Sequence, residues 1–358
     1  MRRVYFTPGP SALYFTAEHH IKYALKHGIA SISHRSKQFE DIFKAAETNL
    51  RELLSLPENY QLVFTNSATE IWEKMTDSFI NKRSLHLVNG AFSKKFYSVV
   101  TNLHKEADIL ESPWGEMPDF TTNQEVQYDL IGVTHNETST GVKTPLDKLY
   151  SLKDQHPEAL LAVDAVSSLP VVDFDYTNID TVYASVQKAF GIPAGLGVWL
   201  VNDKAIEKAN QMKERGLLRD TYHNLPSLIA QARKHQTPST PNVLNIYLLS
   251  EIAKDMVHRG ISQIRNDSIY KSAIMYNMLD QHELLKPFVT EKALRSDTII
   301  LIDSGGRTYD LIDYISDHKM QVSDGYGKMK GKQVRIANFP THSKEQFEML
   351  VDLIEKFH

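Results

Sequence analysis

Short apolar runs alternate along this chain with longer segments that are apolar on one side only. The runs at residues 60–64, 85–89, 130–135, 160–166, 181–186 and 197–201 predict buried strands, because each is short and nearly continuous. The segment 40–56 predicts a helix, since Phe43, Ala46 and Leu50 fall on one helical face. This alternation predicts an α/β fold, in which helices flank a mostly parallel sheet.

The pattern changes after about residue 255. Apolar runs at 297–303 and 333–338 predict strands around a helix at 309–319, and a second helix at 343–357 follows. Ser343 and Gln346 have the spacing of a capping box at the start of that last helix. We therefore predict a large domain over residues 16–254 and a smaller α+β domain formed by residues 1–15 and 255–358.

Composition excludes several classes of protein. The 358 residues are 42% apolar and 23% charged, and the net charge of -4 leaves no broad basic field for nucleic acid. No apolar run has the length of a membrane span, and no apolar stretch follows the two arginines near the start, so we expect a cytoplasmic protein. The cysteine count of zero excludes disulfides, thiolate zinc sites and a cysteine nucleophile. No metal site is predicted.

Two polar segments follow predicted strands and could bind a ligand. In the first, Ser67, Ala68 and Thr69 stand between a strand and a helix, where the first backbone N–H groups of the helix suit a phosphate. The same residue types also form ordinary helix caps. The second segment, residues 134–141, is dense in hydrogen-bonding side chains, although these residue types are also common in turns.

An aspartate and a lysine end two other apolar runs. Asp164 could hold a proton on a nitrogen heterocycle, or it could cap the next loop. Lys188 follows the run at 181–186, where burial would lower its pKa and free a neutral amine; the alternative is a side chain that extends to solvent. Their spacing of 24 positions suits one strand, a crossover and the next parallel strand, which places both at one sheet edge.

Together these groups match the needs of one cofactor. Pyridoxal 5'-phosphate requires a cradle for its phosphate, a carboxylate for its ring nitrogen, polar groups for its ring hydroxyl and an amine for its aldehyde. The sequence therefore predicts a pyridoxal 5'-phosphate site at the carboxyl ends of the strands, where sheets of this kind bind ligands.

Five segments in the same order resemble a known family. They are "SHRSKQF" (33–39), "GAFSKKF" (90–96), "HNETSTG" (135–141), "ASVQKAFGIPAGLG" (184–197) and "QTPSTPN" (236–242). They are similar to segments of the phosphoserine aminotransferases, within the class V, fold type I enzymes that depend on pyridoxal 5'-phosphate. The resemblance extends from "TPGPS" to "VRIANFP", nearly the whole chain. It implies a homodimer with shared active sites.

The resemblance also implies roles for residues around the cofactor ring. Lys188 would form the Schiff base with the cofactor and later carry a proton, and Asp164 would keep the ring nitrogen protonated. Phe92 would stack on the ring, at a position where the family often has tryptophan. Thr138 would donate a hydrogen bond near the ring hydroxyl.

The phosphate and the substrate would be held by further residues. The resemblance places the cofactor phosphate against Ala68, Thr69 and Gln187, and against Gln236 and Thr237 of the neighbouring subunit. It places Arg335 on the substrate α-carboxylate, and His34 and Arg35 across the dimer interface on the distal group of the substrate. Lys328 and Met329 stand where the family tends to carry a His-Arg pair, so Lys330 or Lys332 would have to supply that charge.

The expected reaction is transamination between amino acids and 2-oxo acids. The family reaction converts L-glutamate and 3-phosphohydroxypyruvate to 2-oxoglutarate and O-phospho-L-serine, in serine biosynthesis. An aminotransferase of the alanine-glyoxylate or serine-pyruvate kind is the alternative: His34 and Arg35 favour a phosphorylated or dicarboxylic substrate, whereas Lys328 and Met329 leave the alternative open. A non-catalytic relative would typically lack the lysine or the aspartate. A cysteine desulfurase is excluded, since the chain has no cysteine.

Overall fold

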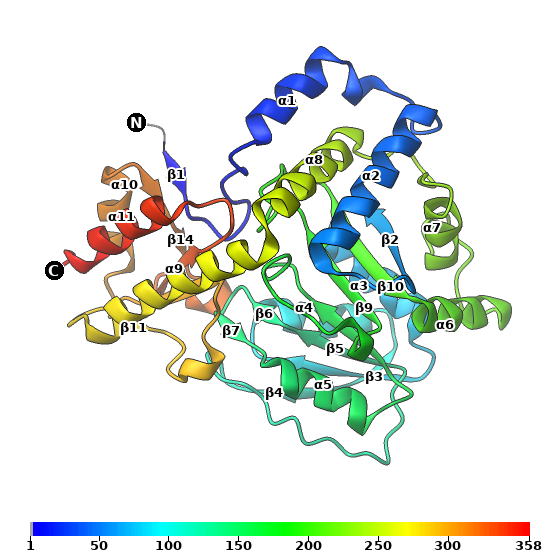
Figure 1. Cartoon of the computed structure of the whole chain (residues 1–358). Helices are drawn as coiled ribbons and strands as arrows, with labels where there is room; N and C mark the ends of the chain where they lie inside the picture. Colours follow the sequence, from blue (N-terminus) through cyan, green and yellow to red (C-terminus); the bar gives the residue numbers. More distant parts are fainter. Residues whose placement is uncertain (1–2) are drawn as a thin grey trace.

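A seven-stranded sheet forms the centre of the computed structural model, which describes residues 3–358 (Figure 1). The strand order is β2-β10-β9-β8-β5-β3-β4. The strands are β2 (Tyr60–Thr65), β3 (Arg83–Val88), β4 (Glu106–Glu111), β5 (Leu130–Thr134), β8 (Leu160–Asp164), β9 (Thr181–Ser185) and β10 (Gly197–Asn202). Only β10 runs antiparallel to its neighbours, so the predicted α/β fold with a mostly parallel sheet is confirmed.

Six of these strands were predicted, and their bounds differ from the prediction by at most two residues. The prediction missed β4, which lies at the sheet edge with only β3 beside it. Its residues are half-buried or exposed, and glutamates stand at both ends. A strand with this pattern lacks the continuous apolar run that marks a buried parallel strand.

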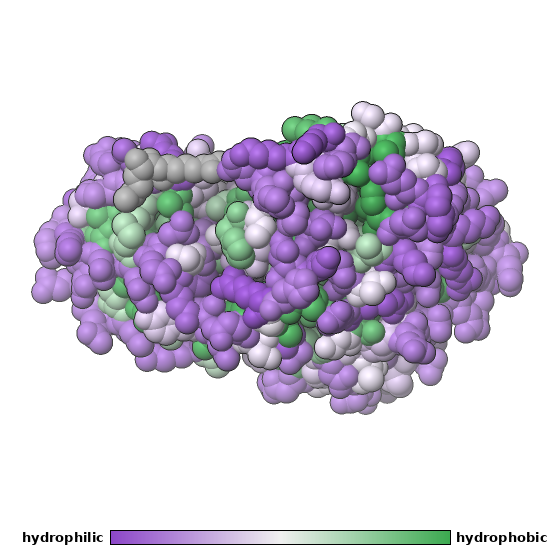
Figure 2. Space-filling model, turned by 45° about the horizontal axis from the view of Figure 1, so that its top comes forward, coloured by the Kyte–Doolittle hydropathy of each residue, from purple (hydrophilic) through white to green (hydrophobic). Residues whose placement is uncertain are grey.

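Helices cover the sheet and form the rest of the large unit. They are α1 (Ala17–Lys26), α2 (Lys37–Leu54), α3 (Ala68–Phe79), α4 (Ala91–Asn102), α5 (Leu146–Gln155), α6 (Asp203–Glu214), α7 (Leu225–Ala232) and α8 (Val243–Arg259). The predicted helix at 40–56 corresponds to α2, which begins after Ser36, whose hydroxyl accepts the N–H of Phe39. Its apolar face packs along α8 (Figure 1). On the face shown in Figure 2, hydrophilic residues surround small groups of apolar ones.

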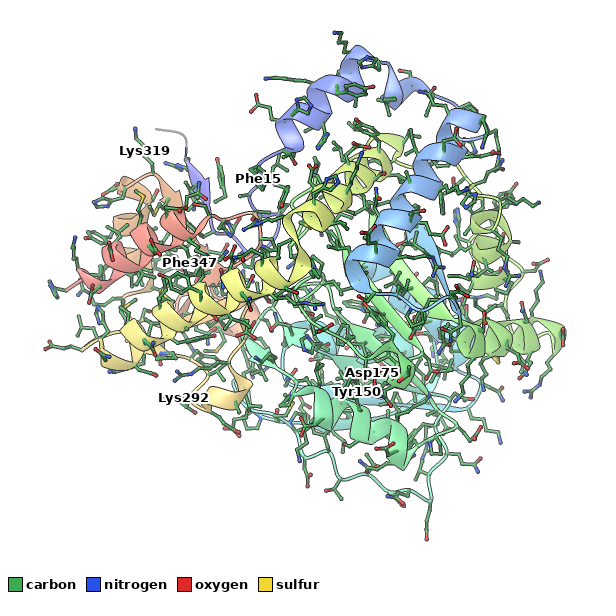
Figure 3. All side chains as sticks on the ribbon, in the orientation of Figure 1. Phe15, Tyr150, Asp175, Lys292, Lys319 and Phe347 are labelled. Carbon is green, nitrogen blue, oxygen red and sulfur yellow. The ribbon has the colours of Figure 1, made fainter. Side chains whose placement is uncertain are left out.

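The C-terminal part has its own sheet and its own apolar core. The sheet contains β11 (Lys286–Pro287), β12 (Ile299–Asp303), β15 (Gln333–Ala337) and β14 (Ser323–Asp324), and the helices are α9 (Ile261–Gln281), α10 (Thr308–Asp317) and α11 (Lys344–Glu355). Phe347 of α11, labelled in Figure 3, packs in this core with Phe6 from the N-terminal segment. The capping box of Ser343 and Gln346 is present as predicted.

Short elements connect these parts. They are β1 (Val4–Tyr5), β6 (Asn136–Glu137), β7 (Val142–Lys143), β13 (Met320–Gln321) and the 3-10 helices at Ile29–Ser31, Tyr176–Asn178, Lys292–Leu294 and Gly327–Met329. β1 pairs in parallel with β13, so the N-terminal segment joins the C-terminal part of the chain. The predicted boundary at residues 254–255 lies inside α8, whereas the helical path breaks at Gly260 with a φ of 87°. The division into domains stays a prediction.

The direction of the strands determines where a ligand could bind. The carboxyl ends of β2, β3, β5, β8 and β9 lie at one edge of the central sheet, and the second sheet adjoins this edge. Asn136, after β5, donates a hydrogen bond of 3.2 Å to Thr298. Ala189, after β9, packs with Ile299 and Leu301 of β12. In the described part of the chain, no helix is both long enough and apolar enough to cross a lipid bilayer.

Candidate active site

Asp164 and Lys188 lie at the same edge of the central sheet, as predicted. Asp164 is the last residue of β8, where it pairs with Tyr183 of β9 and with Thr134 of β5. Lys188 follows β9 by three residues. Since β8 and β9 are neighbours and parallel, the crossover between them returns both side chains to one edge.

In the described part of the chain, Lys188 has a buried amine without a carboxylate partner. Its side chain is 9% exposed, and its Nζ lies 5.8 Å from the centre of the Phe92 ring. The N-terminal segment covers it closely, because a Cβ on Gly9 would stand only 2.7 Å from the Lys188 Cε. Burial lowers the pKa of Lys188 to about 8, and the charge of Arg335 also lowers it, whereas Asp164 and Glu137 raise it. Much of this amine is therefore neutral near pH 8.

Asp164 has a buried carboxyl without a cationic partner. Burial raises its pKa to about 7; the charge of Glu137 also raises it, whereas the Val166 N–H, Lys188 and the Tyr183 hydroxyl lower it. Its Oδ1 accepts the N–H of Val166 at 2.9 Å. No basic side chain among residues 3–358 forms an ion pair with it. A protonated ring nitrogen would supply the positive charge that this carboxylate lacks.

Glu137 fixes the start of α4 and with it the Phe92 ring. Its side chain is fully buried and accepts the backbone N–H groups of Phe92 and Ser93 at 3.1 and 2.9 Å. It also accepts the hydroxyls of Ser93 and Ser139 at 3.0 and 2.7 Å. Sequence reasoning did not single out Glu137, although it stands in the polar segment at 134–141. Thr138 is buried beside it in the same loop.

The start of α3 lies against the end of β9, near the predicted phosphate site. Ser67 caps this helix, and the N–H of Ala68 donates to the hydroxyl of Ser185 at 2.9 Å. β10 approaches closely, because a Cβ on Gly197 would lie 2.6 Å from the carbonyl carbon of Ser67. Thr69 is exposed. Since the Ala68 N–H already has an acceptor, a bound phosphate would have to share it with the Ser185 hydroxyl or replace that hydroxyl.

Gln187 connects this region to the N-terminal segment. Its side chain is half-buried, and its carbonyl accepts the N–H of Ser11 at 3.1 Å. The N–H of Tyr14 donates to the carbonyl of Gly191 at 2.8 Å. The loop that carries Lys188 is therefore held from outside by residues 9–14.

Arg335 brings a positive charge from the second sheet. It lies on β15, and its Nε donates to the Asp324 carbonyl at 2.8 Å. Its guanidinium carbon lies 5.4 Å from the centre of the Tyr326 ring. Burial lowers its pKa, and no carboxylate in the described part of the chain pairs with it. An unpaired, half-buried arginine near Lys188 is well suited to bind a carboxylate.

The residues predicted to act across a dimer interface form a separate cluster. Arg35 donates to the Gln236 side chain at 2.8 Å and to the Pro238 carbonyl at 3.3 Å, and Gln236 donates to Glu40 at 3.0 Å. Thr237 is buried and donates to the Ser239 carbonyl at 2.7 Å. In the part of the chain that the structure describes, no hydrogen bond or ion pair joins this cluster to Lys188, Asp164 or Arg335.

His34 precedes this cluster directly. Burial and the charge of Arg35 lower the pKa of His34. The imidazole therefore stays neutral to a lower pH than an ordinary histidine.

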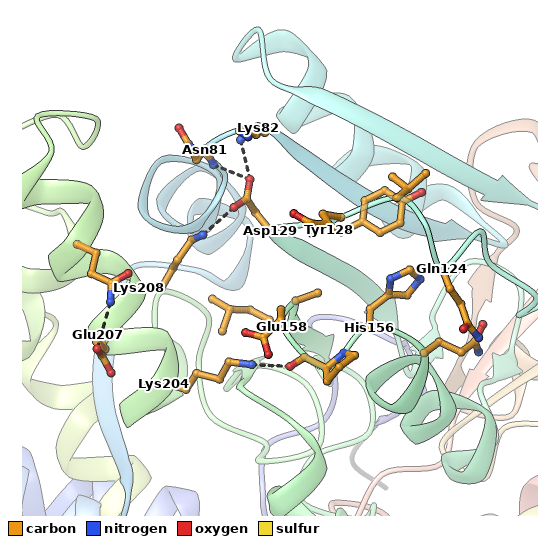
Figure 4. Close-up of a pocket in the computed structure, with 17 residues that line it drawn as sticks. Asn81, Lys82, Gln124, Tyr128, Asp129, His156, Glu158, Lys204, Glu207 and Lys208 are labelled. Atoms are coloured by element: carbon orange, nitrogen blue, oxygen red, sulfur yellow. Dashed lines mark hydrogen bonds and ion pairs between the residues drawn. The ribbon is translucent and has the colours of Figure 1, made fainter.

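A pocket of about 610 Å³ lies at the opposite edge of the sheet (Figure 4). Asp129, which precedes β5, lines it and accepts three backbone N–H groups, among them that of Asn81 at 3.0 Å, as well as the amine of Lys208 at 2.7 Å. Lys204 in the same pocket donates to the Pro157 carbonyl at 2.7 Å. These groups serve the structure, so we do not assign the reaction to this pocket.

Comparisons with known proteins agree with this geometry. A model of the family described as "Aminotransferase class-V" matches residues 105–331. A phosphoserine aminotransferase of Rhodococcus opacus (strain B4) is 31% identical over 333 residues, which cover 90% of this chain and 87% of that protein. The crystal structure of a phosphoserine aminotransferase from Cytophaga hutchinsonii is 42% identical, with a TM-score of 0.95 and 99% of both chains covered.

More distant structures share the fold alone. An alanine-glyoxylate aminotransferase from Nostoc sp. is 20% identical, with a TM-score of 0.83 over 99% of this chain and 95% of that chain. The class that emerges is that of the fold type I aminotransferases. More particularly, the chain belongs to the class-V aminotransferase family, as a phosphoserine aminotransferase-like enzyme.

The pKa of Lys188 predicts how the protein takes up its cofactor. Only the neutral amine reacts with an aldehyde, so the rate at which cofactor-free protein takes up pyridoxal 5'-phosphate should rise with pH and reach its midpoint near pH 8. Asp164→Asn removes a charge that raises this pKa, and its midpoint should lie at lower pH. Absorbance measured after mixing gives both midpoints. A wild-type midpoint above pH 10, as for an ordinary lysine, would contradict the assignment.

Glu137→Gln should destabilise the fold, because an amide cannot accept all the donors around the start of α4. We expect a loss of about 2 to 4 kcal/mol in the free energy of unfolding, measured by urea denaturation. Glu111→Gln is the control. Glu111, the last residue of β4, forms an exposed ion pair of 3.0 Å with Lys94 of α4. That variant should lose less than about 1 kcal/mol. Equal losses in the two variants would remove the proposed role of Glu137.

Proposed function

We propose that this enzyme transfers the amino group of L-glutamate to 3-phosphohydroxypyruvate, which yields 2-oxoglutarate and O-phospho-L-serine. The observation that carries the proposal is the meeting of Lys188, Asp164 and Arg335, three buried or half-buried charged groups without ion-pair partners among the described residues. The similarity to phosphoserine aminotransferases of Rhodococcus opacus and Cytophaga hutchinsonii supports this substrate class.

Pyridoxal 5'-phosphate fits the residues that are present. When bound, it supplies an electron sink for the bond that breaks at the substrate Cα. Lys188 would hold the aldehyde end, Asp164 the ring nitrogen and the Phe92 ring one face of the cofactor. The start of α3 and Gln187 would hold the phosphate.

The protein residues divide the work of the reaction. Arg335 would hold the substrate α-carboxylate with its two-pronged guanidinium and so orient the Cα toward Lys188. The neutral Nζ of Lys188 would then take the Cα proton, since its lowered pKa suits a general base near neutral pH. Asp164 would keep its negative charge against the ring nitrogen. The segment that contains Gly9 would exclude water from the amine.

A homodimer would complete this site. Leu13, Phe15 and Leu25 are 42%, 67% and 65% exposed, and they lie on the segment that leads to His34 and Arg35 (Phe15 is labelled in Figure 3). Apolar side chains exposed in this number along one segment are typical of a surface that a partner covers. Within its own subunit the cluster of Arg35 and Gln236 does not bond to Lys188, so in a dimer it would serve the site of the other subunit.

The preferred substrate can be tested by half-reactions. O-phospho-L-serine and L-glutamate should each convert the cofactor to its amino form at amino-acid concentrations at least about 10-fold lower than L-alanine requires, because a second anionic group adds charge-assisted bonds. Absorbance measured after mixing follows the conversion. Lys188→Ala should show no conversion. Arg335→Ala should require a concentration of every amino acid that is about 10-fold or more higher than the wild type requires. A wild-type preference for L-alanine would instead indicate an enzyme for unphosphorylated substrates.

Hybrid dimers test whether the sites are shared. Lys188→Ala and Arg35→Ala homodimers should each have low activity with 3-phosphohydroxypyruvate. When the two variants are unfolded together and refolded, a hybrid dimer has one site with a wild-type Lys188 and the Arg35 of the other subunit. Random pairing should restore about one quarter of wild-type activity. If each subunit used its own Arg35, mixing would restore nothing.

A further inference from the structure

Two neighbouring aromatic rings, tilted by 33° to each other, contact Lys188 and two further cations. The centres of Phe92 and Tyr326 lie 5.0 Å apart. The Nζ of Lys188 is 5.8 Å from the Phe92 centre, and the Nζ of Lys95 is 5.3 Å from the same centre. Lys95 and Arg335 also lie 5.0 and 5.4 Å from the centre of Tyr326. Three positive groups from separate elements therefore surround one pair of rings.

Lys95 is oriented but not neutralised. Its Nζ donates to the Tyr326 hydroxyl at 2.6 Å, and no carboxylate in the described residues forms an ion pair with it. Lys94, one residue earlier on α4, differs in this respect, because it pairs with Glu111 at 3.0 Å. The chain thus neutralises Lys94 and leaves Lys95, beside Tyr326, without a counter-charge among the described residues.

The loop that carries Tyr326 is held in place. The Oδ1 of Asp324 accepts the N–H groups of Gly325 and Gly331, at 2.6 and 2.7 Å, and so closes the loop at residues 325–331. These bonds fix the ring against which Lys95 and Arg335 both rest. Because the loop is held, the Tyr326 hydroxyl keeps the otherwise flexible Lys95 side chain in one position.

Lys95 differs in its contacts from the lysines that the sequence analysis named near this charge, and the role of those lysines stays a prediction. Lys328 stacks over Trp114, with its Nζ 4.5 Å from the ring centre. Lys330 and Lys332 are exposed. Lys95, on α4, is instead the lysine whose amine contacts the same Tyr326 ring as Arg335.

Two cations that contact one ring without a carboxylate partner among the described residues favour a ligand with two negative charges. A substrate with two anionic groups on a short carbon chain would supply them, with its α-carboxylate on Arg335 and its second anion on Lys95. An ammonium is a point charge that can donate three hydrogen bonds, which suits a phosphate oxygen.

We propose that Lys95, oriented by Tyr326, binds the distal phosphate of the substrate whose α-carboxylate Arg335 binds in the same subunit. This inference rests on the proposed function and names a further residue that determines its specificity. Lys95 contributes attraction for the phosphorylated substrate and takes no part in the proton transfer at Lys188.

The test compares Lys95→Met with Lys94→Met, its matched neighbour. Half-reactions of the loaded enzyme with O-phospho-L-serine and with L-alanine are followed by absorbance, and the half-saturating concentration of each amino acid is measured. In Lys95→Met the value for O-phospho-L-serine should rise about 10- to 100-fold, the usual range for a lost hydrogen bond to a charged group. The value for L-alanine should change by less than about 2-fold, because L-alanine has no second anion.

The Lys94→Met control and two further variants sharpen the test. Lys94→Met should match the wild type with both amino acids. Lys95→Arg should recover most of the lost affinity for O-phospho-L-serine, because it restores the charge. Tyr326→Phe keeps the ring and removes the hydroxyl that orients Lys95. The half-saturating concentration of O-phospho-L-serine should therefore rise by about 3-fold or more, and that of L-alanine should be nearly unchanged.

Two results would overturn the inference, and they differ from each other. If the wild type prefers O-phospho-L-serine and Lys95→Met keeps that preference in full, Lys95 does not bind the phosphate and the proposed function stands. If the wild type shows no preference for O-phospho-L-serine over L-alanine, the proposed function fails and the inference fails with it. Because Lys95 is exposed on α4, Lys95→Met should fold and bind cofactor as the wild type does.

Discussion

The site depends on one constraint, which is that two opposite charges are buried at neighbouring strand ends without forming an ion pair. The parallel register of β8 and β9 brings Asp164 and Lys188 to one edge, and burial shifts both pKa values toward neutrality. A salt bridge would make each group inert. Held apart, both charges remain available to a ligand that carries an aldehyde at one end and a basic nitrogen in its ring.

The rest of the chain isolates that edge from water. Residues 9–14 lie over the loop that carries Lys188, and β1 ties the same N-terminal segment to β13 near the other end of the chain. The second sheet contributes Arg335 from β15, and its β12 packs against Ala189. An N-terminal segment and the second sheet therefore line the same side of the site.

Positive charge is distributed unevenly around the site. Lys94 is neutralised by Glu111, whereas Lys95 and Arg335 meet at Tyr326 without a carboxylate. Glu137, by contrast, is a buried carboxylate whose oxygens accept hydrogen bonds at the start of α4, and these bonds position Phe92. Glu137 is thus fully bonded, whereas no carboxylate among the described residues pairs with Lys95 or Arg335.

The sequence by itself determined six of the seven strands of the large sheet, the helices that it named, and the positions of Asp164 and Lys188 at strand ends. These features follow from the spacing of apolar residues and from local capping, as at Ser343 and Gln346, so they can be read from short stretches. Only the tertiary structure decided that β10 runs antiparallel and that β4 forms the edge. It also decided that Glu137 serves α4, that Arg35 meets Gln236, and that Lys95 rather than Lys94 remains unpaired. Those outcomes depend on contacts between segments far apart in the chain, which neither periodicity nor residue type specifies.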